Sequence, residues 1–145
     1  MKTYGILHGP NLDRLGTREP SVYGSQSLAD LEADLKANLK SREVALAFYQ
    51  SNHEGALVDA LWRWYDEGVA GVVLNPGALT HTSVALRDAL SGTGLPAVEV
   101  HLSNVYRRES FRRHSYTTEV CLAVISGLHF EGYRAALNFL IARES

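Results

Sequence analysis

The segment VAGVVLNP at residues 69–76 contains only apolar residues and glycine before its asparagine. The segment CLAVISG at 121–127 is likewise continuously apolar before its serine. A strand with one face in water alternates apolar and polar side chains, whereas a strand covered by helices on both faces is apolar throughout. We therefore expect both segments to be central strands of a parallel β-sheet that lies between two layers of helices.

The rest of the chain alternates short strand-like runs with segments of helical periodicity. The first predicted helix is the best defined, since Ser27 can cap it and leucines recur along one face from Leu28 to Leu39. The strands are predicted at 3–9, 43–50, 69–75, 97–101 and 119–127. The later helices are predicted at about 54–67, with Leu57, Val58, Leu61 and Tyr65 inward, after Thr82, with Val84, Leu86 and Leu90 inward, and along 132–145. Right-handed connections then give an α/β fold with a five-stranded parallel sheet.

Length and composition indicate one domain spanning residues 1–145. Apolar residues make up 46% of the chain and charged residues 21%, which is ordinary globular usage. The formal net charge of −2 gives no field that would hold a nucleic acid or an anionic membrane, so a small-molecule partner is expected. Cys121 is the single cysteine, and the N-terminus shows neither a signal-peptide pattern nor a membrane-spanning run. We therefore expect a cytoplasmic protein.

Polar clusters follow four of the predicted strands. GPN at 9–11 follows the first strand, QSNH at 50–53 the second, NPG at 75–77 the third and HLSN at 101–104 the fourth. The carboxyl ends of parallel strands meet at one edge of a sheet, and ligands bind in the crevice there. The four clusters therefore predict a single site at this edge.

Several common catalytic motifs are absent from the sequence. It contains no G-x-G-x-x-G, no phosphate-binding G-x-x-x-x-G-K-[ST] and no G-x-S-x-G. None of the six histidines is paired at the i, i+4 spacing of a helical zinc motif, so no metal site is predicted. Lys2 starts the first strand, and Lys36 and Lys40 lie on the outer face of the first predicted helix, so no lysine is placed for Schiff-base chemistry. Arginine, histidine, asparagine and tyrosine remain as the groups that can act.

Residues 9–24, GPNLDRLGTREPSVYG, form a loop with glycines and prolines at several turns, which is typical of a lid over a site. Taken alone, Tyr23 is best interpreted as an aromatic side chain that packs over the sheet edge. Beside a positive charge it becomes a possible base. Only about 0.1% of an ordinary tyrosine is ionised at neutral pH, but a guanidinium at about 4 Å stabilises a phenolate by roughly 4 kcal/mol. Arg18 is the candidate for this charge, because arginine stays protonated at every relevant pH.

Seven motifs spread over the chain resemble those of type II dehydroquinases: GPNL, REPSVYG, QSNHEG, NPGALTHTSVALRDAL, EVHLSN, ESFRRHS and GYRAAL. The resemblance implies a flavodoxin-like fold with helices on both faces of a five-stranded parallel sheet. It also implies a hydro-lyase, 3-dehydroquinate dehydratase, which removes water from 3-dehydroquinate by anti elimination through an enolate and gives 3-dehydroshikimate. This is the third step of the shikimate pathway of aromatic amino acid biosynthesis, and the family uses neither a metal nor an organic cofactor.

The resemblance further implies roles for individual catalytic residues. Tyr23 corresponds to the base that takes a proton from C2 of the substrate, and Arg18 to the residue that lowers the pKa of this base. Asn11 corresponds to the residue that holds a water molecule at the enolate oxygen. His101 corresponds to the acid that protonates the departing C1 hydroxyl group, and Glu99, two residues earlier on the same strand face, to its orienting partner.

Substrate binding and assembly are also implied by the resemblance. The backbone N–H groups of Leu102 and Ser103 correspond to those that receive the substrate carboxylate. The side chains that contact the substrate correspond to Asn75, His81, Ser103 and Arg112. Asp88 corresponds to a residue that reaches a neighbouring subunit's site in the family's trimer. Because the family joins four trimers into a dodecamer, a homo-oligomer is expected.

Other interpretations stay open at this point. Apart from its motif, His81 is also compatible with a cap at the start of a helix. His53 and Glu54 are better interpreted as groups that hold the loop after the second strand than as substrate contacts. The fold by itself is compatible with a non-catalytic flavodoxin-like module that binds a small anion or a flavin. His8 and Asp13 depart from the family, which commonly has asparagine at the first position and asparagine or glycine at the second, so lid geometry is open.

Overall fold

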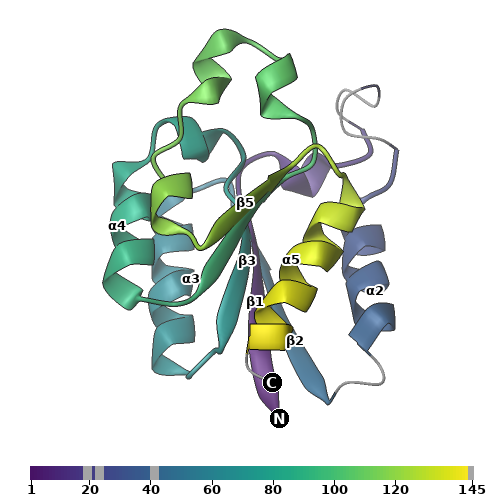
Figure 1. Cartoon of the computed structure of the whole chain (residues 1–145), viewed down its shortest axis with the longest axis vertical. Helices are drawn as coiled ribbons and strands as arrows, with labels where there is room; N and C mark the ends of the chain where they lie inside the picture. Colours follow the sequence, from purple (N-terminus) through teal and green to yellow (C-terminus); the bar gives the residue numbers. More distant parts are fainter. Residues whose placement is uncertain (18–20, 22–24, 40–42, 144–145) are drawn as a thin grey trace.

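The computed structural model describes residues 1–17, 21, 25–39 and 43–143. Within these residues, five parallel strands form one sheet in the order β2-β1-β3-β4-β5 (Figure 1). The strands are β1 (Lys2–His8), β2 (Val44–Gln50), β3 (Gly71–Asn75), β4 (Ala97–His101) and β5 (Ala123–Ser126). This strand order is that of flavodoxin-like folds, and it confirms the predicted fold class.

Helices cover both faces of the sheet. The helices α2 (Leu28–Leu39) and α5 (Phe130–Arg143) pack on one face, and α3 (Glu54–Asp66) and α4 (Val84–Thr93) pack on the other (Figure 1). The 3-10 helices of the described segments are η1 (Leu12–Arg14), η2 (Gly77–His81), η3 (Val105–Arg107), η4 (Ser110–Arg113) and η5 (Thr118–Val120). In the described part of the chain, no helix combines the length and apolar character needed to cross a membrane.

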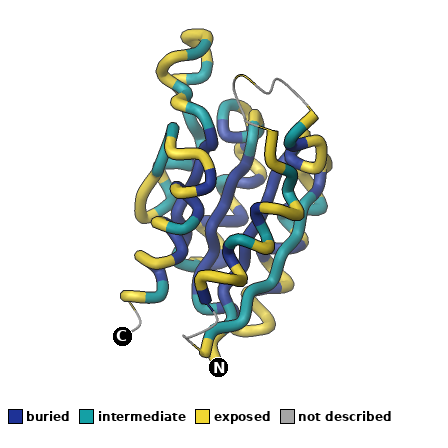
Figure 2. Tube along the Cα trace, turned by 90° about the vertical axis from the view of Figure 1, so that its right-hand side faces the viewer, coloured by how far each residue is buried: buried dark blue, intermediate teal, exposed yellow. Residues whose placement is uncertain are grey.

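The alternation of side chains along the central strands divides the core into two halves. Ile6 and Val73 face α2 and α5, whereas Leu7 and Leu74 face α3 and α4. All residues of β3 are buried, and Figure 2 shows the buried strands between the partly exposed helices. These observations confirm that the segment VAGVVLNP supplies a central strand.

Close packing of α3 against β1 depends on Gly5. A Cβ atom at this position would lie 2.4 Å from the ring of Trp64, which is closer than real Cβ contacts come. Trp64 is 3% exposed, whereas Tyr65, which was predicted to face inward, is 51% exposed. Leu57 and Leu61 are buried as predicted, but the inward residue in the last turn of α3 is Trp64, because Gly5 leaves room for its ring. Val84 at the start of α4 is also exposed, against the prediction.

The starts of α2 and α4 follow from local hydrogen bonds. The Oγ of Ser27 accepts a hydrogen bond from the backbone N–H of Asp30 at 3.1 Å, and the Asp30 carboxylate accepts one from the N–H of Ser27 at 2.9 Å. This reciprocal pair resembles a capping box and confirms Ser27 as the cap of α2. At α4 the cap is Ser83, whose Oγ accepts from the N–H of Leu86 at 2.9 Å. A capping role for His81 at this helix is therefore wrong.

The prediction that CLAVISG forms a central strand is also wrong. The strand β5 covers only Ala123–Ser126 and lies at the edge of the sheet beside β4. The helix α5 covers Ile125 on one face, whereas Leu122 and Val124 are 50% and 45% exposed. A continuous apolar run is therefore not sufficient to place a strand in the middle of a sheet.

Candidate active site

A pocket opens at the carboxyl ends of β1, β3 and β4. These strand ends point toward the top of Figure 1. Three of the four predicted polar clusters contribute to it, together with η3, η4 and Arg108 between them. The lining residues are Pro10, Asn11, Leu12, Asn75, Gly77, Ala78, His81, His101, Leu102, Ser103, Val105, Arg108 and Arg112. The strand-end clusters at 9–11, 75–77 and 101–104 therefore meet at one site, as the topology requires.

The fourth cluster, at the end of β2, supports the loop after β1 instead of lining the pocket. Asn52 Oδ1 accepts a hydrogen bond from the backbone N–H of Asn11 at 2.8 Å. Gln50 Nε2 donates to the carbonyl oxygen of Gly9 at 3.2 Å. His53 is exposed at the start of α3 and is not among the described lining residues. This placement agrees with the interpretation of His53 as a structural residue.

Asn11 adopts an uncommon backbone conformation at the mouth of the pocket. Its φ of 72° and ψ of −4° lie in the left-handed region, which asparagine tolerates better than most other residues. Such conformations cost energy and persist where the surrounding structure fixes them. The hydrogen bond to Asn52 supplies this restraint, so the position of Asn11 is set by two loops together.

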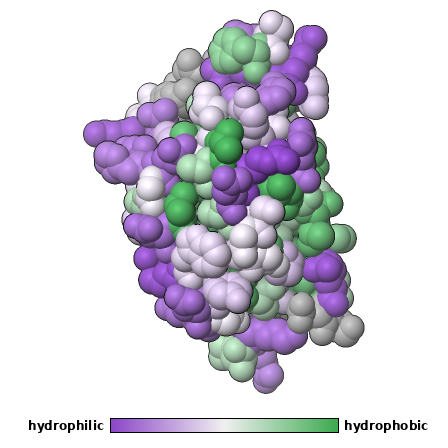
Figure 3. All heavy atoms as spheres, turned by 90° about the vertical axis from the view of Figure 1, so that its left-hand side faces the viewer, coloured by the Kyte–Doolittle hydropathy of each residue, from purple (hydrophilic) through white to green (hydrophobic). Residues whose placement is uncertain are grey.

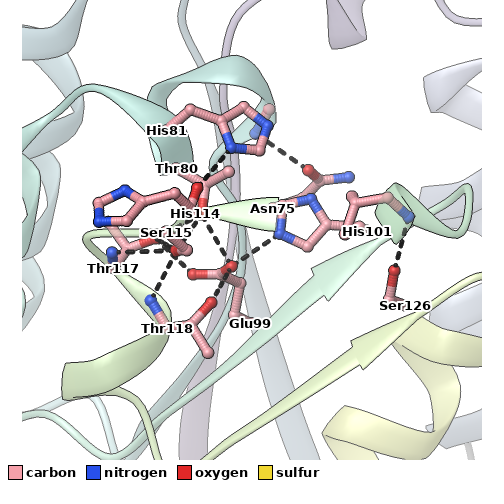
Figure 4. A network of polar contacts seen from close by, with 12 residues as sticks. Asn75, Thr80, His81, Glu99, His101, His114, Ser115, Thr117, Thr118 and Ser126 are labelled. Carbon is pink, nitrogen blue, oxygen red and sulfur yellow. Dashed lines mark hydrogen bonds and ion pairs between the residues drawn. The ribbon is translucent and has the colours of Figure 1, made fainter. Parts of the chain in front are cut away.

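His101 and Glu99 form a buried pair on one face of β4. The Nε2 atom of His101 lies 2.7 Å from Oε2 of Glu99. Glu99 is fully buried, whereas His101 is 8% exposed and lines the pocket. In Figure 4, the other ring nitrogen of His101, Nδ1, points away from Glu99 toward Asn75. The imidazole therefore has one nitrogen held by a carboxylate and the other directed toward the pocket side.

Threonine hydroxyl groups surround the Glu99 carboxylate as donors. Thr80 Oγ1 donates to Oε2 at 2.9 Å, Thr118 Oγ1 donates to the same atom at 2.7 Å, and Thr117 Oγ1 donates to Oε1 (Figure 4). Burial by itself raises the pKa of this carboxyl group. The hydrogen bond and charge of His101, with the hydroxyls of Thr117 and Thr118, outweigh burial and hold the Glu99 pKa below its ordinary value. The buried carboxyl group is therefore ionised and hydrogen-bonded on both oxygens.

The side chain of Asn75 is held by the backbone of Gly77 and by the buried Tyr133. Its Oδ1 accepts a hydrogen bond from the N–H of Gly77 at 3.1 Å, and its side chain also hydrogen-bonds the Tyr133 hydroxyl. The Tyr133 hydroxyl lies 3.0 Å from Nδ1 of His8. Burial lowers the pKa of His8 to about 3 and raises the pKa of Tyr133. Asn75, at the end of β3, is thus held by neutral groups.

The helices η2 and η4 supply an imidazole and a guanidinium on one side of the pocket. His81 Nδ1 donates to the carbonyl oxygen of His114 at 2.7 Å, which leaves Nε2 as the acceptor nitrogen. Burial lowers the His81 pKa, and the charge of Arg112 adds to this, although the bond to His114 opposes it. Arg112 Nε donates to Glu109 Oε2 at 2.6 Å, and Arg112 lines the pocket. A guanidinium beside polar donors suits an anionic ligand.

The predicted site residues divide into three groups. Those that line the pocket are Asn11, Asn75, His81, His101, Leu102, Ser103 and Arg112. Glu99 lies directly behind His101, and Asp88 is exposed on α4 away from the described lining. Tyr23 and Arg18 lie outside the described residues.

Sequence reasoning missed the hydroxyl groups around Glu99 and the pairing of His8 with Tyr133. Thr80 stands inside the motif that carries His81, and Thr117 and Thr118 follow the motif that carries Arg112. A usable signal was the glutamate in the otherwise apolar run AVEV at 97–100, because a buried carboxylate requires donors. The sequence does not say which distant segment supplies those donors.

Comparisons with known proteins agree over almost the whole chain. A family model described as Dehydroquinase class II matches residues 2–141. The 3-dehydroquinate dehydratase 1 of Ralstonia nicotianae is 54% identical over 138 residues, which cover 95% of this chain and 88% of that protein. The 3-dehydroquinate dehydratase of Ralstonia pickettii is 57% identical over 136 residues, which cover 94% of this chain and 88% of that protein.

A solved structure extends this agreement to three dimensions. The type II dehydroquinase from Butyrivibrio crossotus is similar with a TM-score of 0.94 and 41% sequence identity, and the match covers 97% of each chain. Sequence and fold therefore point to the same relatives. Since the family model and the relatives span nearly the full length, this chain belongs to the class II dehydroquinase family.

Proposed function

We propose that this class II dehydroquinase eliminates water from 3-dehydroquinate in the pocket at the strand ends, with His101 as the acid. As a member of the family, the chain is a hydro-lyase of the shikimate pathway, a 3-dehydroquinate dehydratase. The observation that carries the proposal is the His101 imidazole, held by the buried Glu99 carboxylate at 2.7 Å and open to the pocket. We place the enzyme in the cytoplasm, where its single cysteine stays reduced.

His101 is proposed to protonate the C1 hydroxyl group as it departs. The Glu99 carboxylate is held by three threonine hydroxyls and lies 2.7 Å from Nε2, so it fixes the orientation of the His101 ring. General acid catalysis of this kind contributes about 10²- to 10⁴-fold in rate. Glu99 touches no reacting atom and serves to position the ring.

Tyr23 is proposed as the base that removes the C2 proton, with Arg18 as the charge that makes its phenolate accessible near neutral pH. Both residues lie outside the described part of the chain. The support for these roles is the match of the segment REPSVYG to the family and the lack of a lysine suited to the task. A phenolate base and an imidazolium acid are the complementary pair that an elimination requires.

Asn11 is proposed to hold a water molecule at the enolate oxygen, and its fixed left-handed backbone supports a precise position. We assign the substrate carboxylate to the backbone N–H groups of Leu102 and Ser103. The ring hydroxyl groups are assigned to Asn75, His81 and Arg112, which surround the same pocket. No metal or organic cofactor takes part in this proposal.

The direct test is to incubate the purified protein with 3-dehydroquinate and follow the conjugated enone product by its ultraviolet absorbance. We expect turnover that is unchanged by a chelator or by borohydride. In Tyr23→Phe, kcat should fall at least about 10²-fold while substrate binding persists, because only the proton acceptor is lost. The matched control is Tyr65→Phe, which removes a hydroxyl from a side chain that is 51% exposed on α3. A wild-type protein without turnover would contradict the proposal.

A homo-oligomer, specifically four trimers joined as a dodecamer, is proposed for the quaternary state. The chain leaves Leu122 and Val124 exposed at the sheet edge, and Asp88 is exposed on α4. Figure 3 shows apolar side chains among polar ones on the side of the molecule that carries α4. Light scattering is expected to give twelve times the chain mass of 16.0 kDa. A monomer that is fully active would contradict a role for Asp88 in a neighbouring site.

The alternative of a non-catalytic module that binds a flavin or a small anion is separated by two measurements. Titration with flavin mononucleotide, followed by calorimetry, should give no heat of tight binding. The same protein should turn over 3-dehydroquinate. Binding of flavin without turnover would favour the alternative. The buried acid and its carboxylate partner argue against it, because anion binding needs neither.

A further inference from the structure

Ser115 sets the direction of the hydrogen bonds around Glu99. Its Oγ accepts from the backbone N–H groups of Thr117 and Thr118 at 3.2 and 3.0 Å, so its own proton is available for Thr80 Oγ1. A hydroxyl group has a single proton to donate. Thr80 accepts the proton of Ser115 and directs its own to Glu99 Oε2 at 2.9 Å. The chain of hydroxyl groups therefore runs in one direction, toward the carboxylate.

The three threonine hydroxyls that hydrogen-bond Glu99 in the described structure are then all donors, and His101 Nε2 lies against the same carboxylate at 2.7 Å. A protonated carboxyl group would have to donate a bond itself, and one of these buried donors would lose its acceptor. We infer that the hydroxyls of Thr80, Thr117 and Thr118 keep Glu99 ionised, so that His101 holds a proton on Nε2 and serves the substrate through Nδ1. The three threonines are thus positioning residues that act through the Glu99–His101 pair.

The last step of this inference rests on the proposed function. Removal of the C2 proton leaves its electron pair in the enolate, and the enolate then forms the C1–C2 double bond while the C1–O bond breaks. The Nδ1–H bond of His101 breaks at the same time, and its proton joins the departing oxygen to give water. The imidazole is left neutral with its proton on Nε2, still bonded to Glu99.

Other charged or titratable groups border this pair and stay unchanged in the variants below. They are His81, Arg112, Arg113, His114, Glu119 and Cys121. Thr118 is not a described lining residue of the substrate pocket, so its replacement tests the carboxylate and not substrate contact.

The test replaces Thr118 with valine, which keeps the shape of the side chain and removes its hydroxyl. We expect kcat to fall about tenfold, the effect of losing one hydrogen bond to a charged group, with KM changed less than about twofold. Part of the enzyme then holds its proton on Glu99 and not on His101. Thr118→Ser restores the hydroxyl and should restore kcat. Thr117→Val, which removes the donor to Oε1, is a second variant with the same expected result.

Thr93→Val is the matched control. Thr93 is 5% exposed in α4, and its hydroxyl donates to the carbonyl oxygen of Leu90 at 3.3 Å, away from Glu99. This variant loses a buried hydroxyl of the same kind and should keep wild-type kcat. A loss of kcat in Thr93→Val equal to that in Thr118→Val would show that the effect is general destabilisation, and would overturn the inference.

Infrared difference spectroscopy tests the protonation of Glu99 without reference to turnover. The C=O band of the protonated carboxyl group, identified by its absence in Glu99→Gln, should appear at higher pH in Thr118→Val than in the wild type. The same pH in both proteins would overturn the inference even if kcat differed. If the wild type shows no turnover but the band moves as expected, the proposed function fails while the role of the threonines in holding Glu99 ionised stands.

Discussion

His8 and His101 each end a strand of the same sheet, but their surroundings differ in burial and in the charge of the hydrogen-bond partner. His8 ends β1 and is fully buried, with Nδ1 3.0 Å from the Tyr133 hydroxyl. His101 ends β4 and is 8% exposed, with Nε2 2.7 Å from the Glu99 carboxylate. One histidine has a neutral partner and no opening to the pocket, and the other has a charged partner and lines it.

The difference shows that the partner, and not the place at a strand end, decides what a buried histidine can do. Burial without a negative partner lowers the pKa of His8 to about 3, so its ring is neutral in any ordinary buffer. Its Nε2 has no hydrogen-bond partner among the residues that the structure describes. His101 instead has Nε2 against the Glu99 carboxylate and lines the pocket. Only the second arrangement fits the proton donor that we propose.

Replacement of each histidine by asparagine gives the largest contrast between the two positions. We expect His101→Asn to lower kcat about 10³-fold, because the proton donor is lost, with the fold retained. His8→Asn should lower kcat less than about threefold, since His8 is fully buried and is not among the described lining residues, although its backbone pairs with Asn75 in the sheet. Steady-state enone formation measures both values. Equal losses in the two variants would contradict the assignment of His101 as the acid.

The fold could be predicted from the sequence where local patterns of apolar and polar residues indicate a strand or a helix. The strand VAGVVLNP and the cap at Ser27 were predicted correctly, because each depends on neighbouring residues. The run CLAVISG was misplaced at the centre of the sheet, since an apolar run does not identify the element that covers it. Tyr65 was predicted inward because the pattern could not register the space that Gly5 leaves for Trp64.

The candidate site was predictable where its residues follow strands and unpredictable where it depends on side chains from distant segments. Strand alternation is enough to place Glu99 and His101 on one face. The hydroxyls of Thr80 and Thr117 come from segments 19 and 18 residues away from Glu99, and only tertiary packing brings them together. His8 and Tyr133 are 125 residues apart, so their contact left no local pattern.

The pH dependence of stability sharpens the comparison for His8. Its pKa is about 3 in the folded protein and 6.5 ordinarily, so between these values the unfolded chain binds a proton that the folded chain does not. The contribution of His8 to the free energy of unfolding is therefore constant above about pH 6.5. Below this pH it falls by about 1.4 kcal/mol for each pH unit, to a loss of about 3 kcal/mol at pH 4. Urea unfolding at fixed protein concentration measures this slope.

His8→Asn serves as the control for that slope, because asparagine does not titrate. Its free energy of unfolding should fall less steeply between pH 6.5 and 4 than that of the wild type, by about 1.4 kcal/mol per pH unit. The contribution of Glu99 is common to both proteins and cancels in the difference. Parallel curves for the two proteins would mean that His8 is protonated in the folded state, which its burial and its neutral partner oppose.

The smallest expected effect concerns the link between the two regions. Tyr133→Phe removes the hydroxyl that joins His8 to Asn75, and it leaves both buried polar groups short of a partner. We expect a loss of about 1–3 kcal/mol in stability, together with a modest rise in KM, because Asn75 lines the pocket and loses one restraint. Tyr65→Phe, at an exposed position of α3, should stay within about 0.5 kcal/mol of the wild type in unfolding experiments.

If Tyr133→Phe lowers kcat as strongly as His101→Asn does, the network behind Asn75 takes part in the chemistry, and the two histidines differ less than their partners indicate. An effect on stability and KM alone would establish His8 and Tyr133 as the support of a binding residue, in contrast to the support that we propose Glu99 gives to a proton donor.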